Sequence, residues 1–154
     1  SRYLDVTKQA YRFCCTRATM ARYYRNMGFY YLSSYNTDMA KACYTYSNIY
    51  YHTDNADSEL NYIENALKEA KDKGVTKDDK EYDIRTMQAM FDKENVEPGP
   101  DSKTIGIVYR VGELMLQDKE YALAKDCFSI VYDITNEQQL EGVLAELDRC
   151  LENA

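Results

Sequence analysis

Residues 39–45 read MAKACYT and residues 123–129 read LAKDCFS, and this repeated stretch decides the fold. Both copies run through an apolar residue, Ala, Lys, a variable residue, Cys, an aromatic residue and a hydroxyl residue. The agreement extends upstream, since Gly28 and Gly112 each stand twelve residues before the shared alanine. Each copy is about thirty-four residues long, which is a period typical of stacked helical units.

The repeated Gly and Ala positions predict where two antiparallel helices approach most closely, because a larger side chain would hold the backbones apart. Cys43 and Cys127 are then expected inside as small hydrophobic residues. Lys41 and Lys125 are expected to extend outward. We therefore interpret the repeated Lys and Cys as packing positions rather than as a duplicated reactive site. Large residues should fill the space beside the Gly and Ala positions: Tyr24, Tyr31 and Tyr44 in one copy, and Val108, Met115 and Phe128 in the other.

The rest of the chain also favours helices. Apolar residues recur at helical spacing within residues 60–70, 84–91 and 140–151. The chain has only two prolines and six glycines, and both prolines lie in EPGP at 97–100. Alternation with a period of two, which would indicate strands, does not persist anywhere. The sequence therefore predicts an all-α fold.

On these residues the chain resembles the tetratricopeptide repeat family, whose units are stacked helix-turn-helix pairs. Residues 21–54 carry its pattern in YRNMGFYYL and MAKACYTYS, and residues 105–138 carry it in VYRVGELML and YALAKDCFS. The resemblance implies antiparallel pairs stacked as a short right-handed α-solenoid of about seven helices.

The expected organisation is a single domain of this type over residues 1–154. Its first helix would complete a preceding unit, which suggests a longer array, and its last helix would close the array with a polar outer face. The expected order is a helix at 3–17, a first repeat at 21–54, a divergent helical hairpin at 56–94, a linker at 95–104, a second repeat at 105–138 and a capping helix at 138–152.

Charge and cysteine content limit the environment and the partners. The net charge is −7, although residues 1–36 carry +5, and the overall negative charge argues against nucleic acid as a partner. No apolar run approaches the length of a membrane span. Five irregularly spaced cysteines favour a reduced, cytoplasmic protein over a disulfide scaffold.

Residues for catalysis are sparse. His52 is the only histidine, and its neighbours Asp54 and Asp57 fit a polar turn better than a metal site. The adjacent Cys14 and Cys15 would point about 100° apart on a helix, which argues against a redox pair. The chain has no Gly-rich phosphate loop and no nucleophile elbow. We predict no enzyme activity, no cofactor and no metal.

The resemblance implies a concave groove, lined by the first helix of each unit, as the ligand surface. Arg22 and Arg25 beside an exposed Phe29 would suit a peptide with acidic and apolar side chains. Alternatively, the arginines are solvated or pair with acidic residues in 57–69. Carried over position by position, the groove residues are Arg22, Arg25, Phe29, Leu32 and Ser33 in the first copy and Tyr109, Glu113, Leu116 and Gln117 in the second.

The resulting hypothesis is a non-catalytic module that binds a protein or peptide in its groove. Two alternatives remain open at this point. The chain is a peptide-sensing regulatory region of a larger protein, or it is a structural array whose groove is filled by its own helix at 58–73 or by an identical chain in a homodimer.

Overall fold

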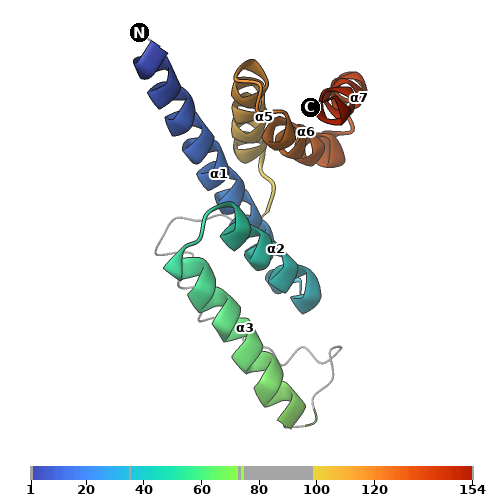
Figure 1. The fold of residues 1–154 in the computed structure, drawn as a ribbon. Coiled ribbons are helices and arrows are strands. Elements are labelled where there is room, and N and C mark those ends of the chain that lie inside the picture. The colour runs from blue at the N-terminus through green and yellow to red at the C-terminus, as the bar shows by residue number, and fades with distance from the viewer. Residues whose placement is uncertain (1, 35, 73, 75–98, 154) are drawn as a thin grey trace. The chain divides into compact units, whose positions relative to one another are not determined.

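The computed structural model describes residues 2–34, 36–72, 74 and 99–153, and within them it contains six α-helices and no strand (Figure 1). The all-α class is therefore confirmed for the described part of the chain, whereas the solenoid and the count of about seven helices stay predictions. The helices are α1 (Arg2–Ser33), α2 (Thr37–Tyr50), α3 (Asp54–Asp72), α5 (Ser102–Gln117), α6 (Tyr121–Thr135) and α7 (Gln139–Glu152).

The chain forms two compact units. The terminal unit comprises residues 1–20 and 100–154, and the central unit comprises residues 21–99. The second half of the hairpin predicted at 56–94 and the start of the predicted linker at 95–104 lie outside the described residues. Whether the chain is one domain of the predicted type stays a prediction.

Helix α1 corrects the prediction of a separate helix at 3–17. It runs without a break from Arg2 to Ser33 and so joins that segment to the first helix of the first repeat. The physical reason is visible in the stretch FCCTRATMARYY at 13–24, which contains neither Gly nor Pro and therefore nothing that ends a helix.

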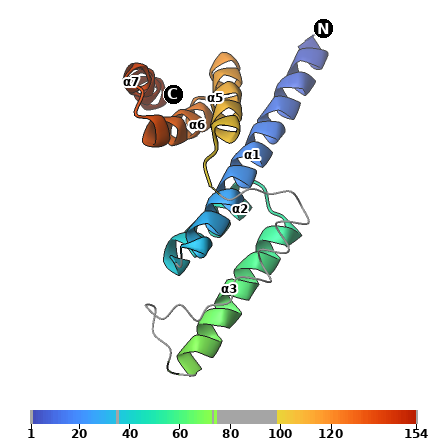
Figure 2. The same cartoon turned by 180° about the vertical axis from the view of Figure 1, so that it is seen from behind.

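In the terminal unit, α5 and α6 form a hairpin that lies side by side in both views (Figures 1 and 2), and α7 packs against α6. A Cβ on Gly112 would lie 3.0 Å from the Cβ of Cys127 and 3.2 Å from the Phe128 ring. Val108 and Met115 are fully buried beside it. This confirms the predicted close approach in the second copy.

The first half of α1 is held in the same unit by Arg12. Its guanidinium donates from Nε and Nη2 to the two carboxylate oxygens of Asp118, at 2.7 and 2.8 Å. This pairing holds the pKa of Asp118 below its ordinary value and raises that of Arg12. Asp118 follows α5 directly, so the ion pair connects α1 to the turn between α5 and α6.

In the central unit, the second half of α1 packs against α2 in the same way. A Cβ on Gly28 would lie 2.8 Å from the ring of Tyr44, which is fully buried. Ser47 Oγ on α2 donates to the carbonyl of Ala21 at 2.7 Å. Both repeat copies therefore place a glycine against the aromatic residue that follows it by sixteen positions.

The two repeated cysteines lie inside their units. Burial raises the pKa of the Cys43 thiol to about 11 and that of Cys127 to about 12. Both thiols are therefore protonated at neutral pH, and the nucleophilic form of cysteine is the thiolate. The Lys125 side chain, by contrast, extends to α7, where its Nζ lies 2.5 Å from Asp148 Oδ1. The predicted burial of Cys43 and Cys127 is confirmed.

Candidate functional site

The groove positions of the first copy do not form an open surface. Phe29 is 1% exposed and Leu32 is 3% exposed, and both belong to the core of the central unit. The predicted exposure of Phe29 is therefore wrong. The reason is that α3 covers it, since Ala56 and Ile63 of α3 are members of the same core cluster.

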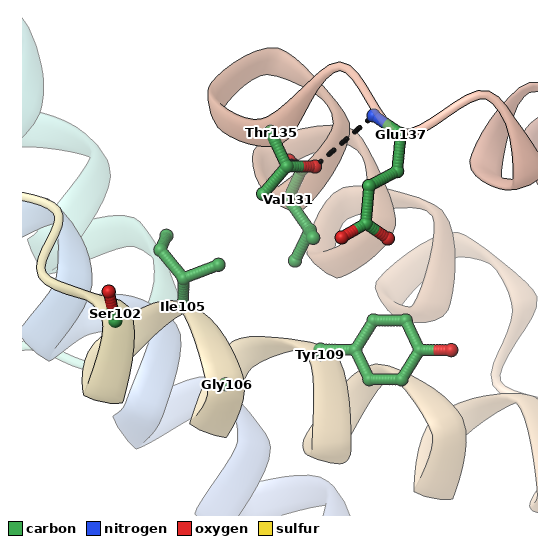
Figure 3. Close-up of a pocket in the computed structure, with 7 residues that line it drawn as sticks. All are labelled: Ser102, Ile105, Gly106, Tyr109, Val131, Thr135 and Glu137. Carbon is green, nitrogen blue, oxygen red and sulfur yellow. Dashed lines mark hydrogen bonds between the residues drawn. The ribbon is translucent and has the colours of Figure 1, made fainter.

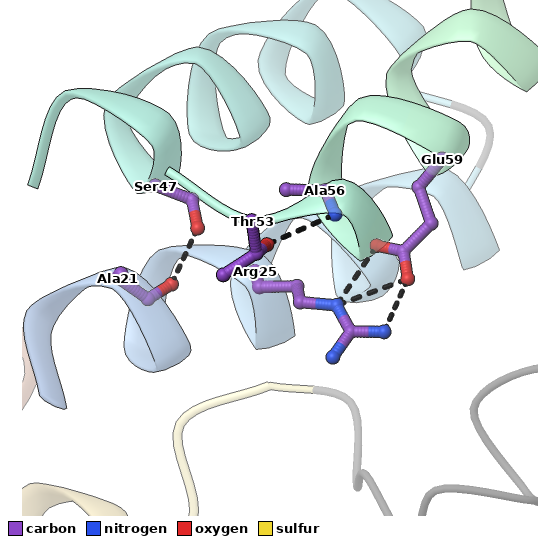
Figure 4. A network of polar contacts seen from close by, with 6 residues as sticks. All are labelled: Ala21, Arg25, Ser47, Thr53, Ala56 and Glu59. Carbon is purple, nitrogen blue, oxygen red and sulfur yellow. Dashed lines mark hydrogen bonds and ion pairs between the residues drawn. The ribbon is translucent and has the colours of Figure 1, made fainter. Parts of the chain in front are cut away.

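Arg25, a second predicted groove residue, is engaged by α3 (Figure 4). Its Nε lies 2.9 and 3.1 Å from the two carboxylate oxygens of Glu59, and its Nη2 also donates to Glu59. Glu59 is fully buried. Thr53 accepts a hydrogen bond from the Ala56 amide at 3.1 Å, which orders the first turn of α3 ahead of Glu59. The alternative in which Arg25 pairs with an acidic residue of 57–69 is thus confirmed.

The remaining residues of the first set, Arg22 and Ser33, are exposed. Ser33 Oγ donates to the Phe29 carbonyl of its own helix at 3.0 Å. The pKa of the Tyr44 hydroxyl lies above its ordinary value, mainly because the group is buried and secondly because the negative charge of Glu59 is near, so this hydroxyl is neutral. The first set therefore leaves only scattered polar groups at the surface of the central unit.

The second set, in the terminal unit, does form one exposed face. Tyr109, Glu113, Leu116 and Gln117 follow one another at steps of four, three and one along α5, which puts them on one side of the helix. Tyr109 is 39% exposed and Leu116 is 40% exposed. The Tyr109 ring meets the buried Phe128 ring edge-on, with 5.6 Å between centroids, so the core holds one side of the tyrosine while the other stays open.

A pocket of about 370 Å³ lies beside this face (Figure 3). Ile105 and Val131 form its apolar base, and Glu137 lies beyond the end of α6. A Cβ on Gly106 would meet nothing within 4 Å, so this side of the pocket is open space. The complete lining is Ser102, Ile105, Gly106, Tyr109, Val131, Thr135 and Glu137.

The pocket carries negative charge at its edge. The Glu137 backbone amide donates to Thr135 Oγ1 at 3.4 Å, while the Glu137 carboxylate has no hydrogen bond or ion pair with the described residues. Residues 100–154 hold eleven acidic and five basic side chains, a net charge of −6. Arg110, Lys125 and Arg149 among the basic ones are already in ion pairs. The site therefore suits an apolar group with a cation beside it.

Tyr109 is the one residue of this lining that the sequence predicted as a site residue. The others were missed because the pocket combines one side of α5 with the end of α6 and the turn that follows it, and no spacing along the chain connects these segments. One signal was present: Gly106 is a second glycine on α5 that the repeat pattern does not require.

His52, Asp54 and Asp57 also come together, with ligand atoms within 4.8 Å of one another. His52 Nε2 lies 2.6 Å from Asp57 Oδ2, and Asn48 donates to the other oxygen of Asp57 at 2.9 Å. The His52 and Asp54 side chains are exposed. No observation beyond this closeness points to a ligand, so we assign no metal here.

Comparison with protein-family models, with curated proteins and with solved structures finds no match for this chain. The family resemblance consequently rests on the repeated residues themselves. Among the helices that the structure describes, none combines the length and the apolar character needed to cross a membrane.

Proposed function

We propose that the protein is a non-catalytic interaction module of the tetratricopeptide type that binds a segment of a partner protein along α5. The observation that carries this proposal is the pocket of about 370 Å³ beside the exposed face of α5. Its volume falls within the range of about 300–1,000 Å³ that is common for ligand sites.

The residues that line the pocket indicate which peptide segment it binds. An apolar side chain enters between Ile105 and Val131, and a Lys or Arg beside it pairs with Glu137. Tyr109 and Leu116 provide further contact area along α5, and tyrosine does so at low entropic cost. This ligand differs from the acidic peptide expected from the sequence, because Arg25 already pairs with Glu59 and the open face carries acidic groups.

The experiment blocks the pocket with a larger side chain of the protein itself. Peptides selected from a random library on the native protein are measured against Gly106→Leu by fluorescence anisotropy. The new side chain enters open space, so the helix should tolerate it. Excluding one buried apolar side chain removes about 1.5–3 kcal/mol of binding, which is about tenfold or more in Kd.

Gly142→Leu on α7 is the matched control, because a Cβ there also meets nothing within 4 Å and Gly142 does not line the pocket. Selected peptides should contain an apolar residue next to Lys or Arg and should keep their affinity for this control. Equal binding to Gly106→Leu and Gly142→Leu would show that the pocket is not the site.

A second candidate function applies to the central unit and is favoured by the Arg25–Glu59 contact. There α3 packs against Phe29 and pairs with Arg25, two of the positions predicted for a ligand, which supports a structural role for this unit. Peptides selected on the native protein should then lose no affinity when the exposed Arg22 is changed to Glu. A large loss of peptide affinity with Arg22→Glu would show that the binding site lies in the first repeat.

A further inference from the structure

Residues 4–18 of α1 have the spacing of a coiled-coil seam. Leu4, Thr7, Tyr11, Cys14 and Ala18 follow one another at steps of three, four, three and four. This is the a and d spacing that brings side chains to one side of a helix for packing against a second helix. The seam spans about two heptads.

None of the five seam residues carries a charge, and four of them are exposed, whereas Ala18 is half-buried. Leu4 is 49% exposed, Tyr11 is 72% exposed, and the adjoining Tyr3 is 83% exposed. Thr7 Oγ1 donates to the Tyr3 carbonyl at 3.0 Å, so its own helix satisfies the hydroxyl. A single exposed large apolar side chain is ordinary, but Tyr3, Leu4 and Tyr11 are gathered on one short stretch of helix, which indicates an interaction surface.

The opposite side of this helix is anchored. Arg12 pairs with Asp118, and Thr16 and Met20 are buried in the terminal unit. Met20 Sδ lies 3.6 Å from Cys127 Sγ. The seam is therefore presented on a helix whose rotation is set by its inner face, and a partner meets a surface that is already ordered.

The flanks of the seam determine the charge of the partner. With Leu4 and Tyr11 at position a, Lys8 falls at e and Arg17 at g, the positions whose charges set partner choice. Lys8 has no hydrogen bond or ion pair with the described residues, and the Arg17 guanidinium lies 5.9 Å from the Phe13 ring centroid. A second copy of the chain would bring the same basic residues to its e and g positions and no acidic residue there.

We infer that this seam, formed by Leu4, Thr7, Tyr11, Cys14 and Ala18, docks an amphipathic helix of a partner protein that has apolar residues at heptad spacing and acidic residues on its flanks. This surface is separate from the α5 pocket, and its ligand has the opposite charge. The inference does not depend on the proposed function.

The test uses two synthetic helical peptides of about three heptads with Leu at a and d. One peptide has Glu at all e and g positions and the other has Lys there. Each is titrated into the full chain and followed by fluorescence anisotropy. We expect the Glu peptide to bind and the Lys peptide to bind at least about fivefold more weakly, because like charges at flanking positions repel.

Variants of the chain locate the contact. Tyr11→Asp puts a charge into the seam and should abolish binding of the Glu peptide, and the high exposure of Tyr11 means that the fold survives. Lys8→Glu should weaken binding several-fold. Lys68→Glu makes the same charge change at an exposed position of α3 and should leave binding unchanged, as should the pocket variant Gly106→Leu.

Three results would overturn the inference. Equal affinity for the Glu and Lys peptides would remove the argument from charge. Unchanged binding to Tyr11→Asp would place the contact elsewhere. A chain that sediments as a dimer and becomes a monomer with Tyr11→Asp would show that a second copy, not an acidic helix, covers the seam.

Discussion

Replacing Gly112 by Ala should destabilise the protein relative to replacing Gly106 by Ala, although both glycines lie on α5. A Cβ at position 106 meets nothing within 4 Å. Gly106→Ala therefore gains only the improved helix propensity of Ala, which is about 0.5–1 kcal/mol in the free energy of unfolding.

At position 112 the same gain is opposed by overpacking. The new Cβ lies 3.0 Å from the Cβ of Cys127 and 3.2 Å from Phe128. The Cβ of Cys127 is bonded directly to the backbone of α6, so it gives way only if the two helices move apart. Overpacking a close contact of this kind costs about 1–3 kcal/mol. Gly112→Ala should consequently be less stable than Gly106→Ala by about 1–3 kcal/mol.

Urea unfolding followed by far-ultraviolet circular dichroism measures this difference. At an m-value of about 2 kcal/mol/M, the midpoints of the two variants should differ by roughly 0.5–1.5 M. Both positions belong to one helix of one unit, so a comparison of midpoints is meaningful if the m-values agree. Equal midpoints, or a higher midpoint for Gly112→Ala, would refute the argument that glycine is needed there for close helix approach.

Three further predictions follow from other contacts. Arg25→Met should lower the free energy of unfolding by about 3–5 kcal/mol because it removes the guanidinium that neutralises the buried Glu59 carboxylate. Arg25→Met with Glu59→Met should recover most of that loss in urea unfolding, and no recovery would mean that the pair itself supplies the stability. Arg12 lowers the folded-state pKa of Asp118. The contribution of Asp118 to stability is therefore present above its unfolded-state pKa of about 3.9 and is lost as pH falls through the lower folded-state pKa. Asp118→Asn should flatten the stability–pH curve on the acid side, and an unchanged curve would contradict this. At pH 8 a thiol reagent should modify the exposed Cys14 and Cys15 within the folded protein. The buried Cys43 and Cys127 have pKa values of about 11 and about 12 and should react only on unfolding. Rapid reaction of four or more thiols in native buffer would show that the two cores open readily.

The sequence by itself determined the contacts that depend on spacing within one helical hairpin. Gly28 meets Tyr44 and Gly112 meets Phe128 because a small residue on one helix and a large residue on its neighbour stand at a set separation along the chain. The burial of Cys43 and Cys127 follows from the same register. The continuity of α1 was also present in the sequence, as the lack of Gly and Pro in residues 13–24, but the repeat pattern led to a break being expected there.

Only the tertiary structure decided which helix covers which face. Phe29 is apolar and Arg25 is charged whether they line a groove or lie beneath a neighbour, so their local sequence is the same in both cases. Their burial depends on α3 placing Glu59 and Ile63 against them. The pocket likewise combines Gly106 and Tyr109 of α5 with residues at the far end of α6, and Leu4 and Tyr11 are exposed because α1 buries its opposite face. Such placements are set by contacts between residues that are distant along the chain. The periodicity of apolar residues indicates only which face of each helix is apolar, and not which neighbour covers that face.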